Sequence, residues 1–164
     1  MAHDANRTMD QNTFPALGSW EVMVGANGSS NRALDDSAGG IDFSVGRYFT
    51  PTTEWVVRQG ISYTNPDYQD DQWFGSTRLA LDQHFAAHGS FRPFVGANFG
   101  GIYGEAVRDS WAAGLEGGVK YYVHPSTFVQ VMVEYAWLFE HGNAIDDRFH
   151  DGRWNWSVGV GFDF

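Results

Sequence analysis

The feature that most constrains this chain is a strict two-residue alternation of apolar and polar side chains. It is clearest near the C-terminal end, where the apolar parity is held by Trp154, Trp156, Val158, Val160, Phe162 and Phe164. The opposite parity is held by Arg153, Asn155, Ser157, Gly159, Gly161 and Asp163. Because successive side chains of a β-strand point to opposite faces, the pattern predicts a strand with one apolar and one polar or bare face.

The same alternation recurs along the chain and predicts eight strands. We expect them near residues 18–28, 39–49, 54–65, 72–85, 91–104, 110–123, 127–140 and 152–164. Several match the ~9–11 residues that a tilted strand needs to cross a bilayer.

The connections between these strands alternate in length. Tight breaks are expected at 50–53, 86–90 and 124–126, and more polar loops at 29–38, 65–71, 105–109 and 140–151. Short turns at one rim and longer loops at the other are typical of outer-membrane barrels, and an even strand count puts both ends of the barrel at the short-turn rim. The sequence therefore predicts one all-β domain, an eight-stranded antiparallel up-and-down transmembrane β-barrel over residues 15–164, with a flexible N-terminal leader at 1–14.

Alternation alone does not say which face lies inside, since a soluble lipocalin-like barrel would turn its apolar face inward. Two properties of the polar face favour a membrane barrel. It is rich in glycine, which relieves crowding inside a small barrel, and its charges nearly balance, so that they can pair across a lumen. The predicted lumen charge network consists of Glu21, Asp42, Arg58, Arg78, Asp82, Arg92, Glu116, Lys120, Glu134 and Arg153.

Aromatic residues on the apolar face gather near the strand ends. Two aromatic girdles around an aliphatic band are what the two interfaces of a bilayer select. The tryptophans assigned to these girdles are Trp20, Trp55, Trp73, Trp111, Trp137, Trp154 and Trp156.

Composition excludes several other classes. The formal net charge of −10 argues against a nucleic-acid partner, and the absence of cysteine excludes disulfides and thiolate metal sites. Charged residues make up 18% of the chain, below the ~25% of typical globular domains. No apolar run approaches the ~20 residues of a membrane helix. The first ten residues are polar and lack a signal-peptide core, so we expect the mature form of an exported protein.

Four segments resemble a known family. The run RPFVGANFGG at 92–101 resembles the P-[YF]-V-G-x-G-x-G strand of small OmpA/OmpX-type, porin-like outer-membrane barrels. The run GLEGGVKYY at 114–122, followed by His124-Pro125-Ser126, resembles the next strand and turn of that family, and Glu134-Tyr135 its "E-Y". The closing Phe162-Asp163-Phe164 is similar to the family's terminal aromatic signature. The resemblance implies a Gram-negative outer-membrane location, with Phe164 as an assembly signal read by the barrel assembly machinery.

The function expected from these features is structural or surface-interacting, with a lumen filled by side chains, and not enzymatic. An eight-stranded interior is only wide enough to be filled by side chains, which favours plugging. The alternative is a narrow pore for ions or small solutes, in which Arg58, Arg78, Glu116, Lys120 and Glu134 would set conductance.

Two chemical hypotheses are weaker. His88-Gly89-Ser90 resembles the His-x-Ser pair of lipid A deacylases, but it falls in a predicted turn without a carboxylate to orient the histidine. His84, His88 and His124 fall near one rim, yet they come from turns and lack the constrained geometry of a zinc site. The sequence therefore predicts no catalytic residues, no metal and no cofactor.

The predicted outer loops are acidic. Their carboxylates are Asp35, Asp36, Asp67, Asp70, Asp71, Glu105, Asp109, Asp146, Asp147 and Asp151. Solubility explains them, and a sharper hypothesis is that divalent cations bridge them to lipopolysaccharide phosphates, because hard cations favour carboxylate oxygens. The expected partners are thus outer-membrane lipids and lipopolysaccharide, with the protein a monomer.

Overall fold

A computed structural model describes residues 15, 17–31, 37–64, 72–85, 90–104, 110–139 and 152–164. The chain forms eight strands: β1 (Trp20–Asn31), β2 (Ser37–Tyr48), β3 (Thr53–Thr64), β4 (Gln72–His84), β5 (Phe91–Gly104), β6 (Ser110–His124), β7 (Thr127–Phe139) and β8 (Gly152–Asp163). Within these described ranges no helix is long and apolar enough to cross a membrane.

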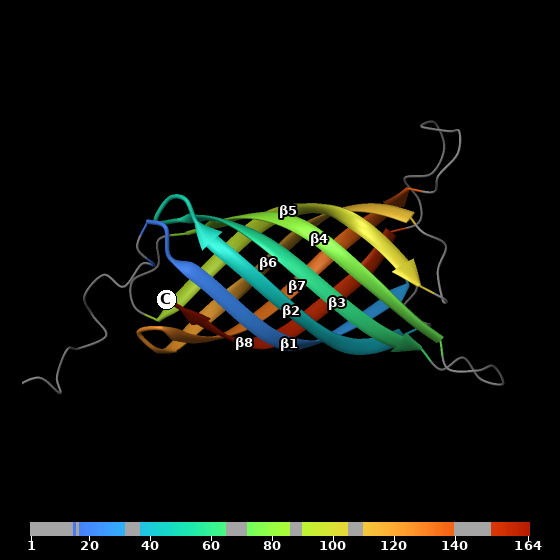
Figure 1. Cartoon of the computed structure of the whole chain (residues 1–164), viewed down its shortest axis with the longest axis horizontal. Coiled ribbons are helices and arrows are strands. Elements are labelled where there is room, and N and C mark those ends of the chain that lie inside the picture. Colours follow the sequence, from blue (N-terminus) through green and yellow to red (C-terminus); the bar gives the residue numbers. More distant parts are fainter. Residues whose placement is uncertain are drawn as a thin grey trace, which may run out of the picture.

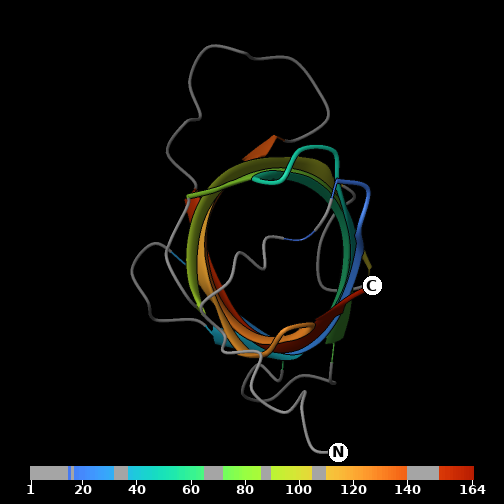
Figure 2. The same ribbon diagram turned by 90° about the vertical axis from the view of Figure 1, so that its left-hand side faces the viewer.

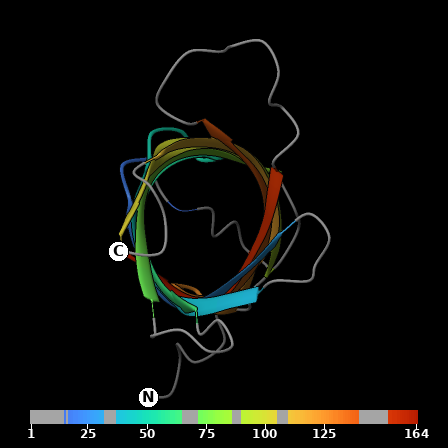
Figure 3. The same ribbon diagram turned by 90° about the vertical axis from the view of Figure 1, so that its right-hand side faces the viewer.

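The eight strands close into a single antiparallel barrel in which each strand pairs with its neighbours in sequence. Closure is made by β1 and β8, which pair from Glu21 opposite Asp163 to Asn31 opposite Arg153. The strands are strongly tilted against the long axis (Figure 1), and both end-on views show a closed ring (Figures 2 and 3). The predicted fold class is confirmed.

The observed bounds agree with the predicted ones to within one residue, except that β1 starts two residues later than expected and that the first hairpin differs. There β1 continues to Asn31 and β2 starts at Ser37, so both strands reach further into the segment 29–38 than expected. The polar and glycine-rich stretch there shows no apolar alternation, yet Ser29 still pairs with Ala38 and with Asn155. Backbone pairing from both sides therefore holds a strand that side-chain pattern alone does not reveal.

The apolar face of the barrel points outward. Val131, Trp156 and Leu79 are 46%, 52% and 57% exposed, whereas Arg78 and Glu134 are 7% and 4% exposed. A closed barrel with an apolar exterior and charged interior is suited to a bilayer and not to water. The inside-out assignment made from the sequence is confirmed.

Glycine on the inner face makes room for the charged side chains. A Cβ atom at Gly46 would overlap the Glu54 carboxylate, and one at Gly96 would overlap that of Asp82. Bare backbone at these two positions therefore leaves space for the Glu54 and Asp82 carboxyl groups against the barrel wall.

Candidate functional site

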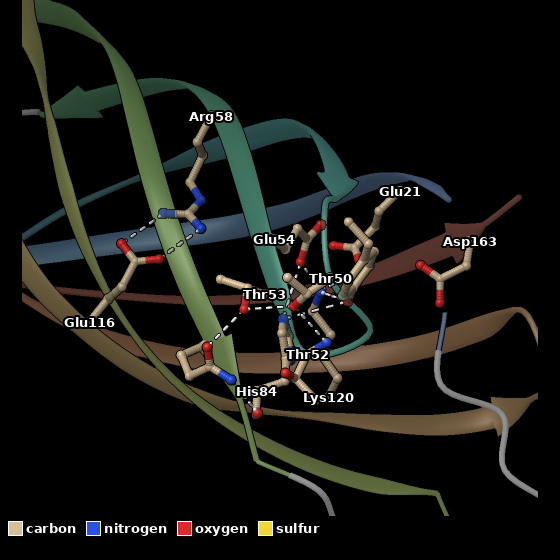
Figure 4. A network of polar contacts seen from close by, with 12 residues as sticks. Glu21, Thr50, Thr52, Thr53, Glu54, Arg58, His84, Glu116, Lys120 and Asp163 are labelled. Atoms are coloured by element: carbon tan, nitrogen blue, oxygen red, sulfur yellow. Dashed lines mark hydrogen bonds and ion pairs between the residues drawn. The ribbon is translucent and has the colours of Figure 1, made fainter. Parts of the chain in front are cut away.

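The lumen near the short-turn rim is filled by a cluster around one lysine, called here the lysine cluster: Lys120, Glu21, Glu54, Tyr48 and His84. The Lys120 ammonium donates to Glu21, to Glu54 Oε2 at 2.9 Å and to the Tyr48 hydroxyl at 3.1 Å. Tyr48 in turn donates to Glu21 Oε2 at 3.3 Å, and His84 Nε2 lies 3.2 Å from Glu54 Oε2. Lys120 is 1% exposed and Glu54 0%, so one buried cation contacts two buried carboxyl groups (Figure 4).

Aromatic rings enclose this cluster. Lys120 Nζ lies 4.9 Å from the ring centroid of Phe128 and 5.4 Å from that of Tyr48, within cation–π range. Beside it, the Arg92 guanidinium stacks 4.1 Å over the Tyr122 ring, whose hydroxyl donates to Asp163 Oδ2 at 2.6 Å. The turn-side half of the lumen is thus filled by charges and rings together.

The middle of the lumen is crossed by a bidentate ion pair. Both terminal nitrogens of Arg58 donate to the two oxygens of Glu116, each at 3.1 Å, as Figure 4 shows. Asn98 donates to the same carboxylate. Fork-to-fork geometry of this kind makes a strong and directional contact.

Toward the longer loops the lumen is less crowded. Arg78 pairs with Glu134, and Asn155 Nδ2 donates to Glu134 Oε2 at 3.1 Å. Ser62 donates to Asn27 Oδ1 at 2.9 Å. A cavity of about 60 Å³ remains among these groups, with Arg153 also in its wall.

The ion pairs that Lys120, Arg58 and Arg78 make across the lumen follow one rule. They link β3 with β6 (Arg58–Glu116 and Lys120–Glu54), β4 with β7 (Arg78–Glu134) and β6 with β1 (Lys120–Glu21). In each case the strands lie three places apart around the ring of eight, so the contacts join nearly opposite walls. They brace the barrel against flattening, which neighbouring-strand hydrogen bonds alone do not do.

The structure places the ten residues of the predicted charge network on the inner face. Nine are buried and Arg153 is half-buried. Lys120 with Glu21, Arg58 with Glu116, and Arg78 with Glu134 form direct ion pairs. Asp42 and Asp82 form no direct ion pair with a described residue, although both act electrostatically on Arg58.

The seven tryptophans assigned to the girdles all lie on the outer face. Trp20 and Trp55 lie at the turn side and make an edge-to-face contact at 6.0 Å, with Arg47 over the Trp20 ring at 5.1 Å. Trp73, Trp111, Trp137, Trp154 and Trp156 lie in the loop-side parts of their strands.

Sequence reasoning missed some lumen residues, Glu54 above all. This residue follows the Thr-rich turn at 50–53 and is not part of the predicted network, yet it lies at the centre of the lysine cluster. Phe94 and Phe128 were missed as well, and both are buried on the inner face at 2% and 0% exposure. The two-residue alternation could have identified Phe94, because it is two residues from both Arg92 and Gly96 and therefore lies on the same inner face.

One polar group lies on the outer face, between the aromatic girdles. Gln59 donates to the Tyr103 hydroxyl at 2.7 Å and accepts from the Thr77 hydroxyl at 2.6 Å. The Gln59–Thr77 pair is midway between the Trp55–Leu81 and Tyr63–Trp73 pairs. The three side chains satisfy one another, as polar groups in hydrocarbon must.

The chemical hypotheses receive no support from the described geometry. His88 lies outside the described residues. His84 points into the lysine cluster whereas His124 is exposed on the β6–β7 turn, and the described ranges contain no group of three or more potential metal ligands. The acidic loop residues also lie outside the described ranges.

No family model matches the chain, and no curated protein sequence is similar to it. Solved structures do match. Neisserial surface protein A superposes with a TM-score of 0.68 at 15% identity, over 89% of this chain and 96% of that one. The outer membrane protein OprG of Pseudomonas aeruginosa gives 0.61 at 12% identity over 93% and 98%. Ail, the attachment invasion locus protein of Yersinia pestis, gives 0.57 at 16% identity over 90% and 99%.

These likenesses concern the fold, which is that of the small eight-stranded outer-membrane barrels. At this level the resemblance predicted from the sequence is confirmed.

Proposed function

We propose that the protein is a closed, non-conducting barrel that anchors its loops at the surface of the outer membrane, and that it is not an enzyme. The observation that carries this proposal is the lysine cluster, in which Lys120 from one wall contacts Glu21 and Glu54 of the opposite wall. With Tyr48, Phe94 and Phe128 also buried there, the turn-side lumen has no room for a hydrated ion.

A surface role is also supported by the kind of protein that shares the fold. One matching protein is named a surface protein and another an attachment and invasion protein. Their barrels are nearly as long as this chain. In this proposal the ion pairs that fill the lumen fix strand register and stiffness, and the loops meet the partner.

Planar-bilayer conductance tests the closed lumen. The wild-type protein is expected to give no reproducible single-channel steps. Lys120→Ala combined with Tyr48→Ala removes the centre of the plug and is expected to give steps. Arg47→Ala, on the outer face beside Trp20, is the matched control and should stay silent. Wild-type steps whose size changes with Arg78→Gln or Glu134→Gln would establish the rival function, a narrow pore. The loop-side cavity is the observation that favours that rival.

An assembly role for Phe164 is proposed on two observations. Its backbone is paired, with the Phe164 N–H donating to the Trp20 carbonyl at 2.9 Å, while its side chain is 73% exposed. The ring is therefore free to meet a partner such as the assembly machinery. Phe164→Ala should lower the amount of folded barrel in cells and leave the urea midpoint of detergent-refolded protein unchanged. Equal amounts of both proteins in cells would remove the proposal.

Two further proposals concern the outer rim. If divalent cations bridge the acidic loops to lipopolysaccharide, a chelator should weaken lipopolysaccharide association, and identical binding with and without chelator would exclude the bridge. If the barrel is not a deacylase, lipid A mass spectra from cells expressing wild type and His88→Ala should be identical.

A further inference from the structure

The loop-side cavity differs from the rest of the lumen in having a volume of its own, about 60 Å³. A cavity needs roughly 10–15 Å³ of such volume to hold one water molecule, so this one has room for several waters. A carboxylate or phosphate group, which takes the place of a few waters, fits such a volume.

Arg153 in the cavity wall has no counter-charge among the residues that the structure describes. Its guanidinium lies 5.5 Å from the Phe74 ring centroid, and among the described residues it has no hydrogen bond or ion pair. It is half-buried, so the charge has already lost part of its hydration. An arginine in that position gains most from an anion that enters the cavity, because a desolvated charge without a partner is unfavourable.

The neighbouring carboxylates do not supply that anion. Glu134 is taken by Arg78 and Asn155. Asp42 also lines the cavity, but its oxygens are buried and its charge acts on Arg58. Arg58 is itself held at both terminal nitrogens by Glu116.

The cavity wall therefore carries two guanidinium groups that Glu116 does not hold, those of Arg78 and Arg153, together with the carboxyl groups of Glu134 and Asp42. The two cations repel each other, which a bound anion would relieve. Ser76, Ser157 and Asn155 line the same space and provide hydroxyl and amide donors. Arginine forks with small polar donors are the usual recognition chemistry for carboxylate and phosphate oxygens.

We propose that the loop-side cavity is a binding site for one small anionic group, a carboxylate or a phosphate, held between Arg153 and Arg78. The site is a closed cup rather than a passage, since the Arg58–Glu116 pair crosses the lumen beneath it. The group belongs either to a free solute or to a lipid headgroup.

Calorimetric titration of the detergent-refolded full chain with sodium phosphate and sodium acetate, in chloride-free buffer, tests the site. The wild type should show saturable binding of at least one anion at one site. Arg153→Gln should weaken it by about tenfold to a hundredfold, the range for loss of a charge-assisted contact. Arg47→Gln removes the same charge outside the lumen and should bind like the wild type.

Heat-modifiable gel migration checks that each variant is folded. If Arg153→Gln does not fold, Arg153→Lys replaces it, because lysine keeps the positive charge but lacks the two-pronged guanidinium. Its affinity should fall between those of wild type and complete loss. Wild-type affinity in Arg153→Gln, or in Arg153→Lys where that variant stands in, would overturn the proposal. So would an absence of saturable binding of both anions by the wild type.

A second arm identifies the source of the anion. The protein is reconstituted in phosphatidylcholine bilayers with and without diphosphoryl lipid A, and the phosphate titration is repeated. A lipid headgroup in the site would weaken apparent phosphate binding by wild type in the presence of lipid A, whereas a free solute as ligand leaves it unchanged. Both results require the site. A silent lumen in bilayer recordings is a separate outcome that leaves it standing.

Discussion

The two halves of the lumen solve the problem of charge inside a barrel in different ways. In the turn-side half, Lys120 is shared between Glu21 and Glu54, and rings close the space around it. In the loop-side half, Arg78 and Glu134 form a simple pair, Arg153 has no described counter-charge and a cavity remains. The same eight strands thus enclose the closely packed lysine cluster at one end and a polar cavity at the other.

The difference indicates that the turn-side half of the lumen contributes more to stability, whereas the loop-side half keeps space for a ligand. Breaking a buried charge pair is costly because the remaining charge is left without a partner. That penalty should be largest where one cation serves two anions, and smallest where a cation already lacks one. Substitutions in the two halves test this directly.

The largest effect is expected for Lys120→Met. It leaves the carboxylates of Glu21 and Glu54 buried together without a cation, and should lower the free energy of unfolding by about 3–5 kcal/mol. Urea unfolding of the lipid-reconstituted protein, followed by tryptophan fluorescence, measures it. The triple variant Lys120→Met with Glu21→Gln and Glu54→Gln should regain most of the loss. A single variant as stable as wild type would mean that the cluster does not brace the barrel.

The next effect concerns the Arg58–Glu116 pair. A double-mutant cycle with Arg58→Met and Glu116→Gln should give a coupling energy of about 2–3 kcal/mol, because the contact is bidentate and buried. The corresponding cycle for Arg78→Met and Glu134→Gln, beside the cavity, should give less than half of that. Equal coupling energies would erase the distinction between the two halves.

Glycine-to-alanine substitutions compare how crowded the two halves of the lumen are. Gly46→Ala places a methyl group against the Glu54 carboxylate, which Lys120 holds in place, and should destabilise by about 1–2 kcal/mol. At Gly60 the nearest atoms are the Ser76 hydroxyl at 3.0 Å and Asn27 Nδ2 at 3.5 Å. Gly60→Ala should therefore stay within about 1 kcal/mol of wild type. Urea midpoints of the two variants give the comparison, and the reverse order would contradict it.

The smallest effect is expected at Arg153. Because this side chain makes no described ion pair, Arg153→Gln should change the free energy of unfolding by no more than about 0.5 kcal/mol in buffer without phosphate or carboxylate. The same urea titration measures it. A loss comparable to that of Lys120→Met would mean that Arg153 has a structural partner, and that both halves are braced alike.

The fold was predictable because strand alternation is a local property. Two neighbouring residues such as Trp156 and Ser157 show which side of the strand is apolar and which is polar, whatever the rest of the chain does. Glycine among the polar-face residues then indicates that this face lies inside the barrel. The strand bounds follow with an error of a few residues, except where the alternation stops before the pairing does, as at Ser29.

The partners inside the lumen were not predictable in the same way. Which acid meets Arg58 depends on the stagger of all eight strands, since Glu116 lies on β6 and Asp42 on the adjacent β2. Glu54 was missed because a Thr-rich turn precedes it. The cavity could not be predicted from the sequence, because its volume depends on how far the Arg78, Glu134 and Asn155 side chains extend into the lumen.

The seam between β1 and β8 has a consequence for how the barrel forms. Its partners Glu21 and Asp163 are separated by nearly the whole chain. Of the eight strand pairs, this one therefore has the largest entropic cost of loop closure. Until it forms, two strands present open edges, and such edges invite pairing with other chains. Closure is therefore expected to be the slow event of folding, sensitive to crowding by unfolded neighbours.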